Sequence, residues 1–217
     1  DSAIFTKIKS KSSFAYADLA GANLKDADLS HIDLRFANLK DAKLQNADLK
    51  KADLQLANLW GAKLQSAKLN HANLRRANLE NANMDGCTLI NAILDGVNGS
   101  SVWLRKADLS KATIQYADFR NALLMDSNME RSFSNGTDYR QANLSRVNFN
   151  HARLKRNVLD HANLTDVSLD DALIREDNWF DRLLQVKVKG AEAIKESYVP
   201  KDSMTLMTRF ILKPVEK

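Results

Sequence analysis

A large apolar residue recurs at every fifth position from Phe14 to Ile174, in 31 of 33 positions. Leu fills 23 of these positions, and the row is broken at Gly99 and Ser134. The residue two positions before each of them is small except at Ile32 and Asn157, and it is Ala in 22 of the 33 units. A period of five fits neither the helical turn of about 3.6 residues nor the two-residue alternation of a strand. The pattern therefore predicts a chain that turns once in every five-residue unit.

If each unit forms one side of a four-sided coil, four units close a turn of about 20 residues. Both the large apolar residue and the small one then point inward on every side. The small residue is a steric demand, since a narrow tube has no room for two large side chains on each side. The many Asp and Asn residues just before the large residue suit tight turns. Coils stacked at the usual strand spacing of about 4.8 Å would form a rod about 40 Å long.

The repeated A-(D/N)-L-x-x unit, as in Ala17-Asp18-Leu19, resembles the pentapeptide-repeat family over residues 12–176, without an insertion. This resemblance implies an all-β fold, a right-handed quadrilateral β-helix of about eight coils. Each repeat of such a solenoid contacts only its neighbours, so caps must cover both open ends.

The chain divides into three parts on this pattern. Residues 1–11 lack the repeat and are expected to form an N-terminal cap, residues 12–176 form the β-helix, and residues 177–217 form a C-terminal cap and helical linker. Within the last part we expect short helices at 191–197 and 203–212, on either side of a proline. The apolar residues of the second helix suit either this module or a further domain. A start without Met and a linker-like end lead us to expect a fragment of a longer protein.

The charge balance argues against nucleic acid as the partner. The net charge is +5, but residues 12–176 hold 21 Lys and Arg against 20 Asp and Glu. Some pentapeptide-repeat proteins inhibit DNA gyrase with a strongly acidic, duplex-like rod, and a balanced surface imitates a phosphate backbone poorly. Binding to gyrase or another topoisomerase therefore stays an alternative, and direct binding of DNA or RNA lacks the basic, aromatic-rich stripe that it needs.

One outward column supplies the first candidate surface, because residues 20 apart become vertical neighbours in the stack. Its apolar and aromatic members, with an arginine rim, have the composition of a protein interface. The amino-terminal cap or the flank of another domain would also cover such side chains, and both explanations stay open. The members of this partner-binding candidate are Tyr16, Phe36, Leu56, Trp60, Arg35, Arg75, Arg76 and Tyr116.

A second candidate surface lies among apolar residues at outward positions beyond the middle of the repeat, namely Trp103, Leu123, Met125 and Phe133. The two breaks in the apolar row lie nearby and lead us to expect bulged corners there. The bulges would frame a binding surface or let these side chains pack locally against each other, and we favour local packing.

We expect no catalytic residue, cofactor or metal. The lone Cys87 occupies an Ala position and should be buried, where a thiol is inert packing. His31 and His71 would lie two coils apart, about 10 Å along the axis, which is too far to share an ion. The chain has no apolar run near 18 residues, so we expect a soluble protein without a membrane segment.

The residues after the repeat carry a narrower resemblance. Asn178-Trp179-Phe180-Asp181, followed by Ala191-Glu192-Ala193-Ile194-Lys195, is similar to the end of the amino-terminal β-helix of the HECT-like ubiquitin ligases that some pathogenic bacteria inject into host cells. In that family the β-helix recruits targets and a later domain carries the catalytic cysteine. The resemblance implies a secreted effector whose partner is a host protein, such as a component of the ubiquitin machinery, and a fragment that is inactive alone.

The function predicted from the sequence is therefore that of a protein-protein interaction module, the target-binding part of such an effector. The alternatives are a repeat protein that binds gyrase or another topoisomerase, located in the cytoplasm, and a structural spacer.

Overall fold

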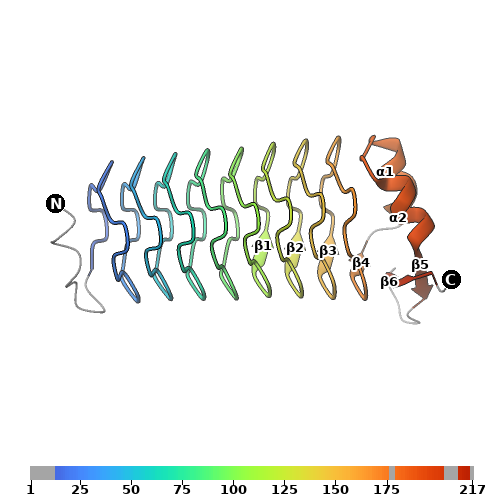
Figure 1. The fold of residues 1–217 in the computed structure, drawn as a ribbon, viewed down its shortest axis with the longest axis horizontal. Helices are drawn as coiled ribbons and strands as arrows, with labels where there is room; N and C mark the ends of the chain where they lie inside the picture. The colour runs from blue at the N-terminus through green and yellow to red at the C-terminus, as the bar shows by residue number, and fades with distance from the viewer. Residues whose placement is uncertain (1–12, 176–178, 203–209, 216–217) are drawn as a thin grey trace.

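The protein forms an elongated stack of coils with helices α1 and α2 at one end of the stack (Figure 1). The computed structural model describes residues 13–175, 179–202 and 210–215, so the cap expected at residues 1–11 lies outside the described residues. Turns recur every five residues, and parallel bridges join residues 20 apart, such as Asp53 and Asn73. Within the described residues these bridges form four ladders offset by five residues. The predicted all-β helix is confirmed.

The interior of the stack is built from the two inward positions of each unit. From Leu24 to Leu94, every one of these side chains is 3% exposed or less. Full burial of a Leu side chain contributes about 1.5–3 kcal/mol. Hydrogen bonds between coils satisfy the backbone; the Leu54 amide, for example, donates to the Asn73 carbonyl oxygen at 2.7 Å. Packing and backbone pairing therefore impose the same 20-residue register.

Each turn places its second residue in the left-handed region, whether or not that residue is glycine. Leu56 has a φ of 58° and Tyr116 a φ of 54°, a conformation that costs a non-glycine residue about 1–2 kcal/mol. The Asp or Asn before the large residue supports the turn, as where the Gln55 amide donates to Asp53 Oδ1 at 3.2 Å. The turn role predicted for these residues is confirmed.

The bulges expected at the two breaks in the apolar row are absent from the described coils. Bridges keep the 20-residue spacing beside both breaks, with Ile114 paired to Ser134 and Asn98 to Asp118. A side chain on Gly99 would overlap the Phe119 ring of the next coil. The expectation was wrong because a larger side chain one coil away fills the missing volume and the backbone keeps its course.

The second break is filled by a buried polar cluster. Ser134 Oγ lies 3.1 Å from the Tyr139 hydroxyl and donates to Asn157 Oδ1 at 3.2 Å. The Thr137 amide donates to the same oxygen of Asn157 at 3.0 Å. Burial raises the pKa of Tyr139, so its hydroxyl stays neutral. Hydrogen bonds thus replace the apolar contact that Leu makes elsewhere.

The regular elements lie toward the C-terminus. Helices α1 (Trp179–Gln185) and α2 (Ala191–Ser197) follow the last coil. The strands form one sheet in the order β1-β2-β3-β4-β6-β5, and their bounds are β1 (Thr113–Gln115), β2 (Phe133–Asn135), β3 (Arg153–Lys155), β4 (Leu173–Arg175), β5 (Tyr198–Asp202) and β6 (Phe210–Pro214).

The C-terminal part combines helices and strands, where the sequence predicted mainly helices. The helix expected at 191–197 is confirmed as α2. The helix expected at 203–212 was wrong for Phe210 to Leu212, which belong to β6, and residues 203–209 lie outside the described residues. The physical reason is the unpaired edge of the last coil, which β6 covers by pairing antiparallel with β4.

Besides the pairing of β6 with β4, other contacts attach this segment to the last coils. The Leu164 amide donates to the Lys189 carbonyl oxygen at 2.8 Å. Gly190, at φ 92°, lies against the backbone of Leu164, where a Cβ would approach to 2.9 Å. The Tyr198 hydroxyl accepts from the Leu169 amide at 3.0 Å. The segment therefore supplies partners to backbone groups that a further coil would otherwise pair.

Across the residues that the structure describes, no helix has the length and apolar character needed to cross a bilayer.

Candidate interaction surface

The outward column predicted from the 20-residue spacing is present on one corner of the stack. Tyr16 and Phe36 stack face to face, with ring centroids 4.7 Å apart and planes 2° from parallel. Leu56 follows in the next coil, and these three side chains are 73%, 44% and 43% exposed. We call Tyr16, Phe36 and Leu56 the apolar ladder. Three adjacent coils thus present large apolar side chains to solvent.

A surface groove continues this column beyond Leu56. Its volume is about 360 Å³. The groove brings together four residues predicted from the sequence, namely Leu56, Arg75, Arg76 and Tyr116. The other four lining residues were not predicted from the sequence, namely Gln55, Asp95, Gly96 and Gln115. We call this site the Gly96 groove.

The glycine explains why the column is hollowed here. Of the six corner residues from Tyr16 to Tyr116 in this column, five carry large side chains and the sixth is Gly96. A Cβ on Gly96 would lie 3.2 Å from Arg76 Cγ. The Tyr116 ring lies over Gly136 in the following coil, 2.9 Å from where its Cβ would stand. Asn135 Nδ2 also donates to the Tyr116 hydroxyl at 3.4 Å. Tyr116 therefore fills the hollow at Gly136 and leaves the one at Gly96 open.

The charges of the groove do not cancel. Arg75 Nε lies 3.6 Å from Asp95 Oδ2, and Asp95 Oδ1 accepts from the Gln115 amide at 3.1 Å. Arg76 is exposed and forms no ion pair with any residue in the described part of the chain. One positive charge is therefore left over in the groove.

Four of the predicted residues lie outside the groove lining: Tyr16 and Phe36, which belong to the apolar ladder, and Trp60 and Arg35. Trp60 stands at the next corner of the coil, where Lys40 Nζ lies 4.9 Å from its ring centroid. Arg35 donates to Asp33 Oδ2 at 2.8 Å, and this hydrogen bond holds the pKa of Asp33 well below its usual range. Both side chains therefore already have partners within the rod.

The second candidate surface is divided between two ladders. Trp103 pairs with Leu123 in one ladder, while Phe133 pairs with Thr113 in another, offset by ten residues or half a coil. Met125 lies at the corner after Leu123. Arg105 lies over the Trp103 ring at 5.0 Å, and Trp103 is 42% exposed. The four residues therefore do not form a single surface, because ten residues of chain carry the backbone half-way round the coil.

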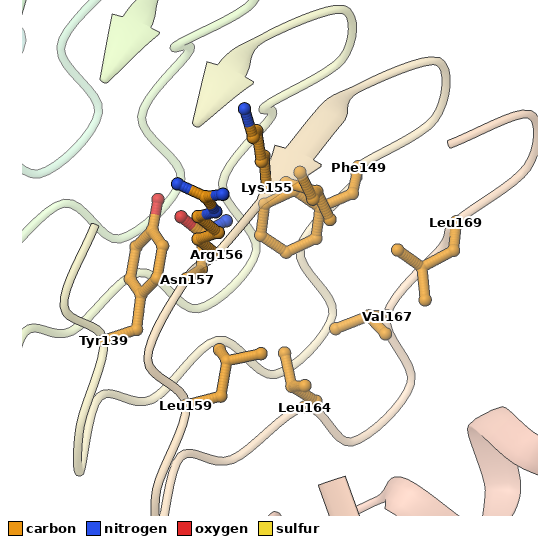
Figure 2. A pocket seen from close by; sticks show the side chains of 10 residues that line it. Tyr139, Phe149, Lys155, Arg156, Asn157, Leu159, Leu164, Val167 and Leu169 are labelled. Atoms are coloured by element: carbon orange, nitrogen blue, oxygen red, sulfur yellow. The ribbon is translucent and has the colours of Figure 1, made fainter. Parts of the chain in front are cut away.

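A small cavity lies inside the C-terminal coils, between the Tyr139 side chain and the apolar residues of the following turns. Figure 2 shows Phe149, Leu159, Leu164 and Val167 around it. Its volume is about 20 Å³, which is room for about one water molecule. The cavity is too small for an organic ligand, so the Gly96 groove is the stronger candidate site.

Other reactive groups give no further site. Burial raises the pKa of the Cys87 thiol, which disfavours the nucleophilic thiolate. Among the described residues, no group of three His, Cys, Asp or Glu side chains is placed to hold a metal ion.

Comparison with known proteins identifies the class. The repeats match the family of Pentapeptide repeats in eight copies, over residues 17–55, 32–70, 57–96, 100–132 and 136–175. The chain belongs to the pentapeptide-repeat family.

Solved structures of other repeat proteins resemble this chain. A trypsin-treated variant of QnrB1, a plasmid-mediated fluoroquinolone resistance protein, is 22% identical over 81% of this chain and 84% of its own, with a TM-score of 0.54. HetL, a pentapeptide repeat protein involved in heterocyst differentiation regulation in the cyanobacterium Nostoc, is 26% identical over 78% of this chain and 92% of its own, with a TM-score of 0.37. The likeness to QnrB1 supports the β-helical fold. A comparison with curated proteins gives no match.

Proposed function

We propose that this chain is a protein-interaction module whose partner docks on the apolar ladder and the Gly96 groove. The observation that carries the proposal is the run of exposed Tyr16, Phe36 and Leu56 in adjacent coils, directly beside a groove that holds two arginines. Contiguous exposed apolar side chains mark interaction sites. Aromatic residues and arginine are also the residue types that contribute most at interfaces.

The shape of the rod belongs to the same proposal. Four ladders and a 20-residue register support a quadrilateral coil, repeated about eight times over residues 12–176. Such a rod presents a long, nearly straight edge, so one partner can contact several coils at once.

We further propose that the module recruits targets for a secreted effector of the HECT-like ubiquitin ligase type. The support is the resemblance carried by Asn178-Trp179-Phe180-Asp181 and by Ala191-Glu192-Ala193-Ile194-Lys195. Helix α1 begins at Trp179 and helix α2 at Ala191, and both follow the last coil. In this role the partner is a host protein, and the chain itself performs no chemistry.

The gyrase or topoisomerase alternative rests on the family and on the shared fold. The near balance of 21 basic and 20 acidic residues over 12–176 disfavours mimicry of DNA. A structural spacer is the third alternative, and it predicts that changes to exposed apolar residues are without effect on binding.

The test is a pull-down from host-cell lysate with the parent chain and the triple variant Tyr16→Ala, Phe36→Ala, Leu56→Ala. The matched control is the triple variant Lys51→Ala, Asn81→Ala, Asn121→Ala, which changes exposed residues of the same left-handed backbone conformation at other corners.

We expect a partner that the parent and the control retain and the ladder variant loses by about tenfold or more, because each truncated interface anchor costs about 1–2 kcal/mol. Circular dichroism must show the same β-rich spectrum for all three proteins. Equal capture by all three proteins contradicts the proposed site, and no specific capture by the parent favours the spacer.

A further inference from the structure

We infer that the Gly96 groove binds a carboxylate presented by an acidic segment of the protein partner. The inference deepens the proposed function and rests on it, since it gives the chemistry of the partner at this surface. Shape, charge and the available donors of the groove support it independently.

The shape favours a single protruding side chain with its neighbours. The volume of about 360 Å³ equals the space of roughly a dozen water molecules. Leu56 and Tyr116 form apolar walls on either side, while the glycine between them leaves the backbone accessible. A partner residue that enters the groove therefore gains apolar contact along its stem and polar contact at its tip.

The charge of the groove favours an anion. Asp95 already receives Arg75 and the Gln115 amide, so its carboxylate does not compete for Arg76. The Arg76 guanidinium carries five N–H donors in a planar fork that matches a carboxylate. A partner carboxylate would therefore supply the ion-pair partner that Arg76 lacks among the described residues.

The other polar groups of the groove fit the same ligand. The Tyr116 hydroxyl accepts a hydrogen bond from Asn135 Nδ2 of the following coil, so Tyr116 contributes an apolar wall to the groove. The Gln115 side chain brings two N–H donors to the lining. An Asp or Glu side chain and a free chain end offer the same carboxylate, and the test distinguishes them.

The probes are two N-acetylated, C-amidated pentapeptides, Ala-Leu-Glu-Phe-Ala and its Glu-to-Gln counterpart, titrated into the 15N-labelled chain and followed by amide chemical shifts. A third probe, the Gln peptide with a free C-terminal carboxylate, represents a chain end. We expect saturable shifts at Arg76, Gly96 and Tyr116, with the Glu peptide binding about tenfold more tightly than the neutral Gln peptide.

Two variants locate the interaction. Arg76→Gln should weaken the Glu peptide to the level of the Gln peptide, while Arg131→Gln, an exposed arginine at the same backbone conformation on another corner, should leave it unchanged. Gly96→Asn, a residue tolerated in the left-handed region, should block all three peptides. Tighter binding of the Gln peptide with a free C-terminus than of the Glu peptide would support carboxylate binding. The carboxylate would then belong to a chain terminus of the partner and not to an acidic side chain.

Equal binding of the Glu and Gln peptides, shifts away from Gly96, or no saturable shift would each overturn the inference. The proposed function and this inference can fail separately. If the ladder variant loses the captured partner while Arg76→Gln retains it, the proposed interaction surface is supported and the inference that the groove binds a carboxylate is overturned.

Discussion

The interior of the rod has a regular stretch from Leu24 to Leu94 and an irregular stretch from there to Ile174. In the first, Leu and Ala alternate with little variation, and every inward side chain is buried. In the second, Phe119 fills the place opposite Gly99, and Ser134, Tyr139 and Asn157 form a polar cluster. The backbone register is the same in both.

The coil therefore requires a filled interior more than it requires any one residue. Large-for-small exchanges compensate across adjacent coils, because the stack brings residues 20 apart into contact. Polar side chains are also accepted inside, as where Ser134 Oγ lies within hydrogen-bond distance of the Tyr139 hydroxyl and donates to Asn157 Oδ1.

The largest effect should come from Leu54→Ala in the regular stretch. The side chain is fully buried, and its removal leaves a cavity that the rigid coil cannot close, so the free energy of unfolding should fall by about 2–5 kcal/mol. Urea denaturation measures it.

Leu56→Ala is the matched control for that substitution. It deletes the same atoms from a side chain that is 43% exposed, so the loss should stay below about 1 kcal/mol. Equal losses for the two variants would contradict the inward and outward assignment.

The irregular stretch can be tested with Gly99→Leu and Phe119→Leu. Gly99→Leu alone should destabilise by about 1–3 kcal/mol, because the new side chain overlaps the Phe119 ring. The double variant restores the repeat pattern of the regular stretch and should recover most of that loss.

Denaturation of both single variants and the double variant completes a thermodynamic cycle for Gly99 and Phe119. Additive losses would mean that the two positions are independent, and that compensation between coils does not operate here.

The smallest effect should come from acid, and it should be alike in both stretches. Arg35 lowers the pKa of Asp33, and Arg120 lowers the pKa of Asp118. A folded-state pKa below the unfolded value of about 4 gives stability that is present above pH 4 and lost as the pH falls through the folded pKa.

Since both pairs are partly solvated, solvent screening keeps the contribution of each to stability small. Melting temperatures between pH 6 and pH 2 measure the loss, and Asp33→Asn and Asp118→Asn should each reduce the slope. A steeper acid response in only one stretch would show that the interior, and not the surface pairs, controls it.

Much of the fold was predictable because the five-residue period repeats without an insertion. The same period is enough to place Leu56, Arg76 and Tyr116 on one column from the sequence alone. The sequence did not predict that Phe119 fills the space at Gly99, because that depends on a contact between coils. Nor did it predict β6, since pairing with β4 depends on the open edge of the last coil.

The candidate site was predictable in part for the same reason. Spacing by 20 identifies the large side chains of the column. It does not identify Gly96 or Asp95, because neither carries a large apolar side chain. The glycine between Arg76 and Tyr116 in the 20-residue column was the feature of the sequence that could have predicted a groove there. Trp60 was predicted on the adjoining side of the coil, near Leu56 in the chain, and it lies at the next corner.

The left-handed corners have a consequence for how such a rod can evolve. Residues as different as Tyr16, Leu56, Arg76 and Asn81 occupy that position with nearly the same φ, and their side chains point away from the interior. A mutation there changes what the edge displays and leaves the coil that displays it intact. Related repeat proteins can therefore keep the same architecture while their corner residues diverge. Two relatives with superimposable rods need not share a binding specificity.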